Sequence, residues 1–329
     1  MEVLKKAGFV LGASLLSSLS FDGKANSIEQ IIECKKVINQ KKLTISAISD
    51  AILHGDTGVA HMAFAIVILT GDKSFTEVIH KRLESLSDSI KDMRLKAVGY
   101  HALAVSTNED LADKLIPLLD HHDGLVRNSA LEAIVELEYN DKLIKPLKKR
   151  MIIESDSTIK PVIIEALCRF DKKNKKEYIN HLNTLASGED NAAATSAVMK
   201  LAELKENYTH SNSRKTDMEV FEKNKKIYDI LQERNVNDDD LKKMVMSKNH
   251  VLRIEAIEII ARKGSKSLQE WMLSAGRVPV AKARLMSAYY LFFTNNKEEA
   301  QKRLVTEKDE DVKVMLLGTL LRAEKELSR

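Results

Sequence analysis

The strongest restriction on the fold of this chain is a repeat in which a polar residue precedes an apolar helical stretch. Six copies begin with Asp or Asn and have an apolar residue three positions later. These starts are separated by 67, 33, 34, 59 and 60 residues, and two of the three large gaps contain a further, degenerate copy. The six starts are Asp56, Asp123, Asp156, Asp190, Asn249 and Asp309. A repeat of about 33 residues is typical of stacked helix pairs.

The residue types in the repeat give its physical meaning. Asp or Asn at a helix start accepts hydrogen bonds from the free N–H groups of the first turn. Small or apolar residues follow at positions +7, +8 and +11, as in Ala130, Leu131 and Ile134. On a 3.6-residue period they form one stripe, and two helices cannot bury such stripes unless the pairs stack. We therefore expect an all-α fold, a right-handed α-solenoid in which each pair contacts only its neighbours along the chain.

The periodicity places helices over most of the chain and no strand. The expected ranges are 27–38, 44–54, 57–70, 74–86, 91–104, 108–120, 124–138, 140–152, 157–170, 174–187, 191–205, 217–234, 238–247, 251–263, 267–275, 280–293, 297–306 and 311–327. Only 12 Gly and 4 Pro among 329 residues agree with this prediction, because β-rich folds need many turn residues.

Residues 113–134 contain the clearest copy, with "LIPLLD" at 115–120 and Val126-Arg127 before Ala130. This segment resembles the HEAT-repeat superfamily, in particular the short HEAT-like repeats first associated with phycobilisome lyases. Weaker copies extend from about residue 44 to the C-terminus. The resemblance implies an α–α superhelix and says little about activity, since such repeats serve as scaffolds, adaptors and, in some cases, enzymes. It also implies that Arg94, Arg127 and Arg253 have structural roles in stacking.

The N-terminal 25 residues have two interpretations. Lys5 and Lys6 precede an uncharged stretch from Ala7 to Phe21, and Gly23 and Ala25 are small. This is the layout of a secretory signal peptide, which slightly favours an exported, periplasmic protein. The alternative is an apolar helix that covers the start of the array. The stretch is too short for a comfortable membrane span.

Charge and cysteine content narrow the classes of function. The net charge of +4 results from 52 basic and 48 acidic residues that are well mixed, which does not favour a nucleic-acid binder. Cys34 and Cys168 are about four repeats apart, so an intramolecular disulfide is not expected. No cofactor is indicated, and the chain lacks a Gly-rich phosphate loop, a Gly-x-Ser-x-Gly motif and a His-Glu dipeptide.

Two groups of residues could carry chemistry, and for both a structural role is the stronger interpretation. His121-His122-Asp123 could bind a metal, but Asp123 already has a capping role. Trp271 could stack on a base in a DNA-repair glycosylase, but packing between helices is the simpler role. An enzyme or ligand-handling protein of HEAT-like fold, similar to such a glycosylase or to a bilin lyase, therefore remains the alternative to a non-enzymatic role.

The second helix of each pair is expected to line the concave surface of a solenoid. Positions off its apolar stripe would then face a partner, and several of them are acidic. We expect a basic or amphipathic protein segment to bind there, the alternative being a solvated polar face. Tyr289 and Tyr290 belong to a run of four aromatics within five residues and would supply an interface anchor. The predicted partner-binding residues are Lys96, Glu132, Glu136, Glu165, Glu258, Tyr289 and Tyr290.

The spacing also divides the chain. We expect an N-terminal array at 26–204, an insertion at 205–237 formed by a polar loop and an extra helix, and a C-terminal array at 238–329. The insertion would act at a binding face or as a hinge. The function that these observations favour is a protein-binding scaffold or adaptor, in some contexts a component of a larger assembly.

Overall fold

The computed structural model describes residues 41–209, 217–234 and 236–327. Within these ranges every regular element is a helix, and no strand occurs. The predicted all-α class is thus confirmed for the described part of the chain. The expected helix at 27–38, the N-terminal 25 residues and Cys34 lie outside it. No helix of the described ranges is both long and apolar enough to cross a membrane.

The chain forms two compact units, which we describe separately. One unit comprises the residues up to Thr107 together with those from Asn237 onward, and the other comprises Asn108–Val236. This grouping follows spatial contacts and does not coincide with a division of the chain into consecutive arrays.

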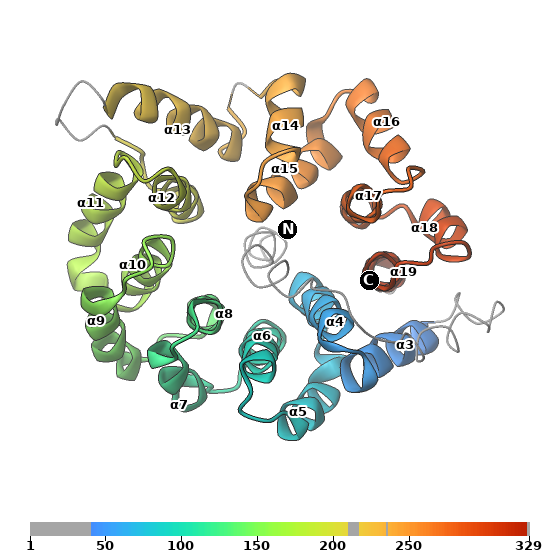
Figure 1. Cartoon of the computed structure of the whole chain (residues 1–329), viewed down its shortest axis with the longest axis horizontal. Coiled ribbons are helices and arrows are strands. Elements are labelled where there is room, and N and C mark those ends of the chain that lie inside the picture. The colour runs from blue at the N-terminus through green and yellow to red at the C-terminus, as the bar shows by residue number, and fades with distance from the viewer. Residues whose placement is uncertain (1–40, 210–216, 235, 328–329) are drawn as a thin grey trace. The chain divides into compact units, whose positions relative to one another are not determined.

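The described part of the first unit contains five helix pairs, which Figure 1 labels. Their bounds are α3 (Lys41–His54) with α4 (Thr57–Thr70), α5 (Thr76–Ser85) with α6 (Ile90–Ser106), α14 (Asp238–Val245) with α15 (His250–Lys263), α16 (Lys266–Ala275) with α17 (Ala281–Thr294), and α18 (Lys297–Leu304) with α19 (Glu310–Leu327). A 3₁₀ turn, η1 (Lys73–Phe75), precedes α5. The second helices pack in the order α15, α17, α19, α4, α6.

One contact in this order joins helices from opposite ends of the chain. The C-terminal helix α19 packs on both α3 and α4. At the centre of the contact Gly318 approaches Ile66 so closely that a Cβ at residue 318 would lie 2.3 Å from Ile66 Cδ1. The expectation that each pair contacts only its neighbours along the chain is therefore wrong for α19. Glycine permits the approach because it has no side chain to separate the two backbones.

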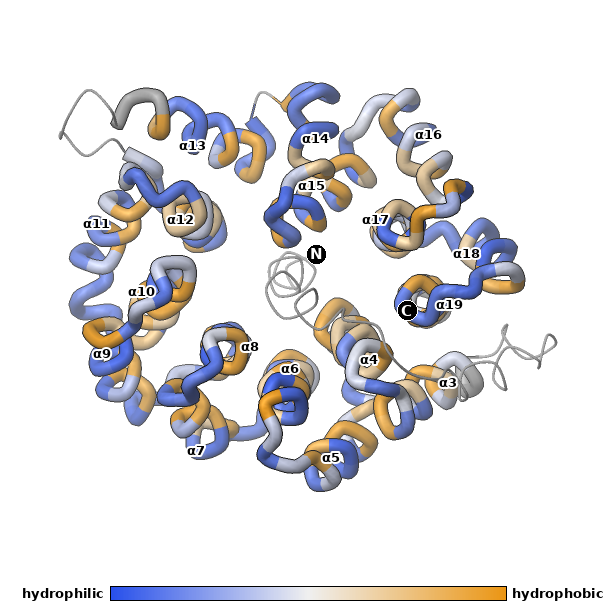
Figure 2. The backbone as a smooth tube through the Cα atoms, viewed as in Figure 1, coloured by the Kyte–Doolittle hydropathy of each residue, from blue (hydrophilic) through white to orange (hydrophobic). Residues whose placement is uncertain are grey.

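The second helices α4 and α19 are buried on nearly all sides. In α4 every residue from Val59 to Leu69 is buried, and in α19 every residue from 312 to 321. A helix surrounded by neighbours needs apolar residues around its whole circumference, which the sequence of α4 supplies (Figure 2).

Helix starts follow the predicted caps, with one exception. Asp56, for example, accepts a hydrogen bond from Val59 N at 3.0 Å, and Asn249 accepts one from Leu252 N at 3.2 Å. Asp156 instead accepts bonds from the backbone N and the hydroxyl of Thr158, and the following helix begins only at Lys160. The short polar side chain thus forms a turn before the helix and does not cap it.

The residues of the second unit that the structure describes form three pairs and a final helix. Their bounds are α7 (Ala112–Leu115) and η2 (Ile116–Asp120) with α8 (Gly124–Glu136), η3 (Asp141–Leu143) and α9 (Ile144–Ile153) with α10 (Lys160–Phe170), η4 (Lys172–Asn174) and α11 (Lys175–Ala186) with α12 (Asn191–Glu203), and then α13 (Asp217–Leu231). The second helices pack in the order α8, α10, α12. The helix expected over 108–120 is broken into α7 and η2, where Pro117 lacks the N–H that an α-helix needs.

The helix α13, which we expected in an insertion, packs on α12. Two of its side chains donate hydrogen bonds to backbone oxygens of earlier residues. Asn224 Nδ2 donates to Ala186 O at the end of α11, at 3.0 Å, and the Tyr228 hydroxyl donates to Glu206 O after α12, at 2.8 Å. These bonds make α13 an integral part of the second unit.

Candidate functional site: buried charges that link helix pairs

The largest concentration of buried charge in the second unit surrounds the ammonium group of Lys200 on α12. Its Nζ lies 2.9 Å from Glu165 Oε2 on α10, 3.4 Å from Glu132 Oε1 on α8 and 3.2 Å from Glu203 Oε2. All four side chains are at most about one-tenth exposed. We call these four residues the Lys200 cluster. It connects three successive second helices through one cation.

The three carboxyl groups around Lys200 differ in pKa. Burial raises the pKa of Glu165, but Lys200 and the Arg169 guanidinium, 2.9 Å from Glu165 Oε1, more than offset this and lower it to about 2. Glu165 therefore carries the negative charge. Burial, together with the neighbouring carboxylates, raises the pKa of Glu132 to about 7 and raises that of Glu203 as well. Glu132 is therefore about half protonated near neutral pH.

The chemistry available to the cluster follows from these shifts. Burial alone would lower the pKa of Lys200, but Glu132, Glu165 and Glu203 together raise it well above its ordinary value. A lysine that stays protonated has no free electron pair for nucleophilic attack. The arrangement instead serves as a polar link in an otherwise apolar core.

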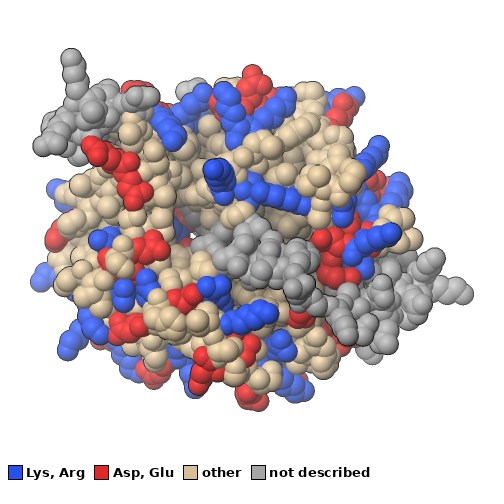
Figure 3. Space-filling model, viewed as in Figure 1, with Lys and Arg blue, Asp and Glu red and all other residues tan. Residues whose placement is uncertain are grey.

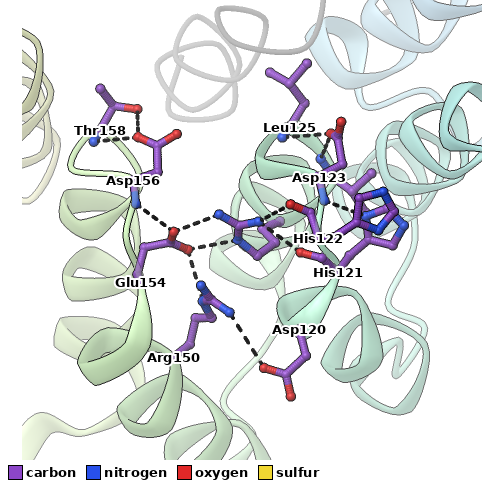
Figure 4. Close-up of polar contacts among 11 residues, drawn as sticks. Asp120, His121, His122, Asp123, Leu125, Arg150, Glu154, Asp156 and Thr158 are labelled. Carbon is purple, nitrogen blue, oxygen red and sulfur yellow. Dashed lines mark hydrogen bonds and ion pairs between the residues drawn. The ribbon is translucent and has the colours of Figure 1, made fainter.

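A second ionic contact links the pairs that contain α8 and α10. Arg127 donates from Nε to Glu154 Oε2 at 2.9 Å and from Nη2 to Glu154 Oε1 at 2.7 Å. Arg150 also donates to Glu154 Oε2, at 3.0 Å, and the backbone N of Asp156 donates to Glu154 Oε1 at 2.9 Å (Figure 4). Burial raises the pKa of Glu154, but these donors outweigh it and hold the pKa at about 2.

Contacts from the same guanidinium groups to backbone carbonyls, two at Arg127 and two at Arg284, complete a recurring geometry. Arg127 Nη1 donates to the carbonyl oxygens of His121 and His122, just before its own helix. In the first unit Arg284 likewise donates to the carbonyls of Val278 and Pro279 and holds Glu307 through two bonds of 2.9 Å. We call each of these arrangements an Arg–Glu clamp. The arginine binds carbonyls of the turn before its own helix. It also binds a glutamate that precedes the second helix of the next pair.

Sequence analysis assigned Arg127 a stacking role but missed its partner. Glu154 and Glu307 both stand two residues before an Asp, in "ESD" and "EKD". Each also accepts the backbone N–H of that Asp, at 2.9 Å. The Glu-x-Asp spacing was the available signal. Lys200 and Glu203 were also missed, since a lone lysine on a predicted apolar helix carries no marker of its charged surroundings.

Most of the predicted partner-binding residues do not lie on an open surface. Glu132, Glu165 and Glu258 are buried. The first two belong to the Lys200 cluster, and Glu258 lies 3.7 Å from Arg262 Nε. The expectation that these positions face outward is wrong, because charges of the same chain already surround the carboxylates.

The remaining predicted partner-binding residues are also enclosed or engaged. Tyr289 and Tyr290 are buried in α17, so neither is an exposed anchor. Lys96 is half-buried and lies 3.0 Å from Asp88 Oδ1. Glu136 is half-buried near Arg169, whose pKa it helps to raise.

The two groups considered for chemistry have structural partners. Asp123 caps α8 by accepting bonds from Leu125 N and Val126 N, and His121 Nδ1 accepts the backbone N–H of Asp123 (Figure 4). Across residues 41–209, 217–234 and 236–327 no group of three His, Cys, Asp or Glu side chains is placed to hold a metal ion. Trp271 is half-buried on α16. Cys168 is buried and free, and burial raises the pKa of its thiol to about 12.

The fold and these links define an all-helical protein built of stacked helix pairs. No family model matches the chain, and no curated protein matches it. Among the solved structures that match is the crystal structure of an engineered protein, 13% identical, with 100% of both chains covered and a TM-score of 0.33. A similarity this weak carries no inference about function.

Proposed function

We propose that this chain is a non-enzymatic scaffold, an α-solenoid of HEAT-like helix pairs that binds another protein. The observation that carries the proposal is that the buried glutamates are paired with cationic side chains of the same chain. Glu165 and Glu154 are each held by two cationic side chains of the same chain. Ionic groups arranged in this way hold helix pairs in register, and these two carboxylates are engaged by cations of the chain itself.

The second unit offers a place for a partner at the turn between α9 and α10. Ile152 is 79% exposed and Ile153 51% exposed, and they are adjacent in the sequence. Two exposed branched side chains on a framework fixed by Glu154 are suited to fill a pocket on another protein. This turn replaces the acidic concave surface as the proposed binding site.

The test is affinity isolation of the tagged full-length chain from its source cells, followed by identification of the proteins recovered with it. We expect Ile152→Asp/Ile153→Asp to lose a partner that the unchanged chain retains. Tyr139→Ser is a matched control, because Tyr139 is 64% exposed in the same unit but precedes α9. Circular dichroism of each variant confirms folding. Recovery of the same proteins by all three chains would rule out this turn as the binding site.

A further inference from the structure

In the first unit the turns within three neighbouring helix pairs lie at one end of the stack. Arg303, near the end of α18, donates to Leu273 O, near the end of α16, at 2.9 Å. Ser265, at the start of α16, donates to Asp238, at the start of α14. These three first helices therefore run parallel, and the turns that follow them, at 246–249, 276–280 and 305–309, lie at the same end.

These three turns expose aliphatic side chains. Met246 is 68% exposed, Val280 61%, Val305 51% and Val278 37%. Each turn contributes at least one of them. Exposed apolar residues that gather on one part of a surface are typical of interaction sites.

The same turns are basic. Lys248, Arg277, Lys282 and Lys308 are exposed. Segments 246–249 and 276–282 contain no acidic residue, whereas the third turn, 305–309, contains Glu307, which is held by Arg284, and Asp309, which caps α19. Figure 3 shows Lys and Arg side chains over α14 to α18, with Asp and Glu side chains among them. We call the segments 246–249, 276–282 and 305–308 the turn edge.

The turns of the turn edge are held by side-chain contacts, and acidic residues lie next to it on one side. The Arg284–Glu307 clamp joins two of its turns, and Pro279 restricts the backbone of one. Toward α4 the charge changes sign, since Asp309, Glu310 and Asp311 begin α19 and Asp56 caps α4. The basic character is thus confined to three neighbouring pairs.

We propose that the turn edge binds the surface of a lipid bilayer that contains anionic headgroups. Aliphatic side chains placed singly on successive turns, with a basic residue beside each, match the boundary between headgroups and acyl chains. A bilayer accommodates separate apolar tips without needing a complementary pocket.

The test is sedimentation of the full-length chain with vesicles of phosphatidylcholine alone or of phosphatidylcholine mixed with phosphatidylglycerol. We expect binding to the mixed vesicles that weakens as salt is added. Lys248→Glu/Lys282→Glu/Lys308→Glu should reduce the partition coefficient by about 100-fold or more, at roughly five-fold for each charge lost. Val280→Ser/Val305→Ser should also reduce it, because apolar contact is lost.

Two matched controls are available in the second unit. Lys114→Glu/Lys142→Glu/Lys145→Glu changes the net charge by the same amount at exposed positions, and Ile152→Ser/Ile153→Ser removes equally exposed aliphatics. Both should retain vesicle binding. All variants keep residues 1–25, so any contribution of that segment is constant.

The proposal is overturned if the unchanged chain ignores the mixed vesicles, or if the charge controls lose binding as completely as the turn-edge variants. It is also overturned if the turn edge captures an acidic protein while the vesicles remain unbound. None of these outcomes bears on the α9–α10 turn, so the proposed protein-binding function is tested separately.

Discussion

Arg127 and Glu154 face each other across two consecutive helix pairs and form two hydrogen bonds of 2.9 and 2.7 Å. Glu154 is fully buried and Arg127 nearly so. Because the arginine also binds the carbonyls before its own helix, one side chain determines both the shape of a turn and the position of the next pair. The same geometry at Arg284 and Glu307 shows that the arrangement occurs in both units.

Replacing Arg127 with Ala should lower the free energy of unfolding of the second unit by about 3–5 kcal/mol, because Glu154 would remain buried with less compensation. Urea denaturation measures the change. Lys149→Ala is the control, since Lys149 pairs with Asp120 on the surface at 2.7 Å and should cost less than about 1 kcal/mol. Equal losses in the two variants would show that the clamp does not stabilise the stack.

Glu132→Gln should change how stability depends on pH. Burial raises the folded pKa of Glu132 to about 7, above an unfolded value near 4.3. Its contribution is therefore fully present below about pH 4.3 and is lost as the pH rises to about 7. The glutamine variant should gain stability relative to the unchanged protein over this range, as measured by urea denaturation at several pH values. A constant difference between the two proteins across the range would contradict the prediction.

The contact between α19 and α4 should also weaken as pH rises. Burial, followed by the nearby carboxylates Asp309, Asp56 and Glu310, raises the pKa of Asp311 to about 7. Its contribution is present below an unfolded pKa near 3.9 and is lost as the pH approaches and passes 7. Hydrogen exchange in α19, corrected for intrinsic rates, should be slower at pH 6 than at pH 8.

Asp311→Asn should remove most of this difference in exchange. Asp239→Asn, at an exposed position in α14, is the control and should leave it intact. If Asp311→Asn retained the full pH effect, another group would have to be responsible.

Gly318→Ala should destabilise the first unit by about 1–3 kcal/mol, because the added Cβ would lie 2.3 Å from Ile66 Cδ1 inside a packed core. The melting temperature measures this. Gly58→Ala is the matched control in α4, where the nearest atom to an added Cβ is 3.4 Å away. Alanine there should be neutral or stabilise the helix by up to about 1 kcal/mol. Adding Ile66→Val to Gly318→Ala should recover part of the loss, and no recovery would place the strain elsewhere.

The periodic positions of the sequence predicted the helices closely. The prediction of a helix over 57–70 agrees with α4 (Thr57–Thr70), because Asp56 caps the start and Gly71 ends the helix in a left-handed conformation. The prediction over 108–120 was wrong in detail, since Pro117 interrupts the helix with a 3₁₀ turn. Local signals were sufficient wherever capping and periodicity agreed.

The side chains of the candidate site were harder to predict. Glu132 and Glu165 occupy equivalent positions in consecutive repeats, which suggested a shared acidic face. Their burial depends on Lys200, which lies in a later repeat and reaches both carboxylates. Helical periodicity gives the angular position of a residue on its own helix, but not the charge that a neighbouring helix brings to it.

The amino-acid sequence by itself therefore determined the helical class and the caps, because these depend on hydrogen bonds and apolar spacing within about one repeat. Only the tertiary structure decided that α19 packs on α4, that Arg127 holds Glu154 and that Lys200 occupies a centre of negative charge. These contacts join residues from 27 to more than 200 positions apart, and their energies depend on burial and on the distance between side chains, neither of which is encoded in local spacing.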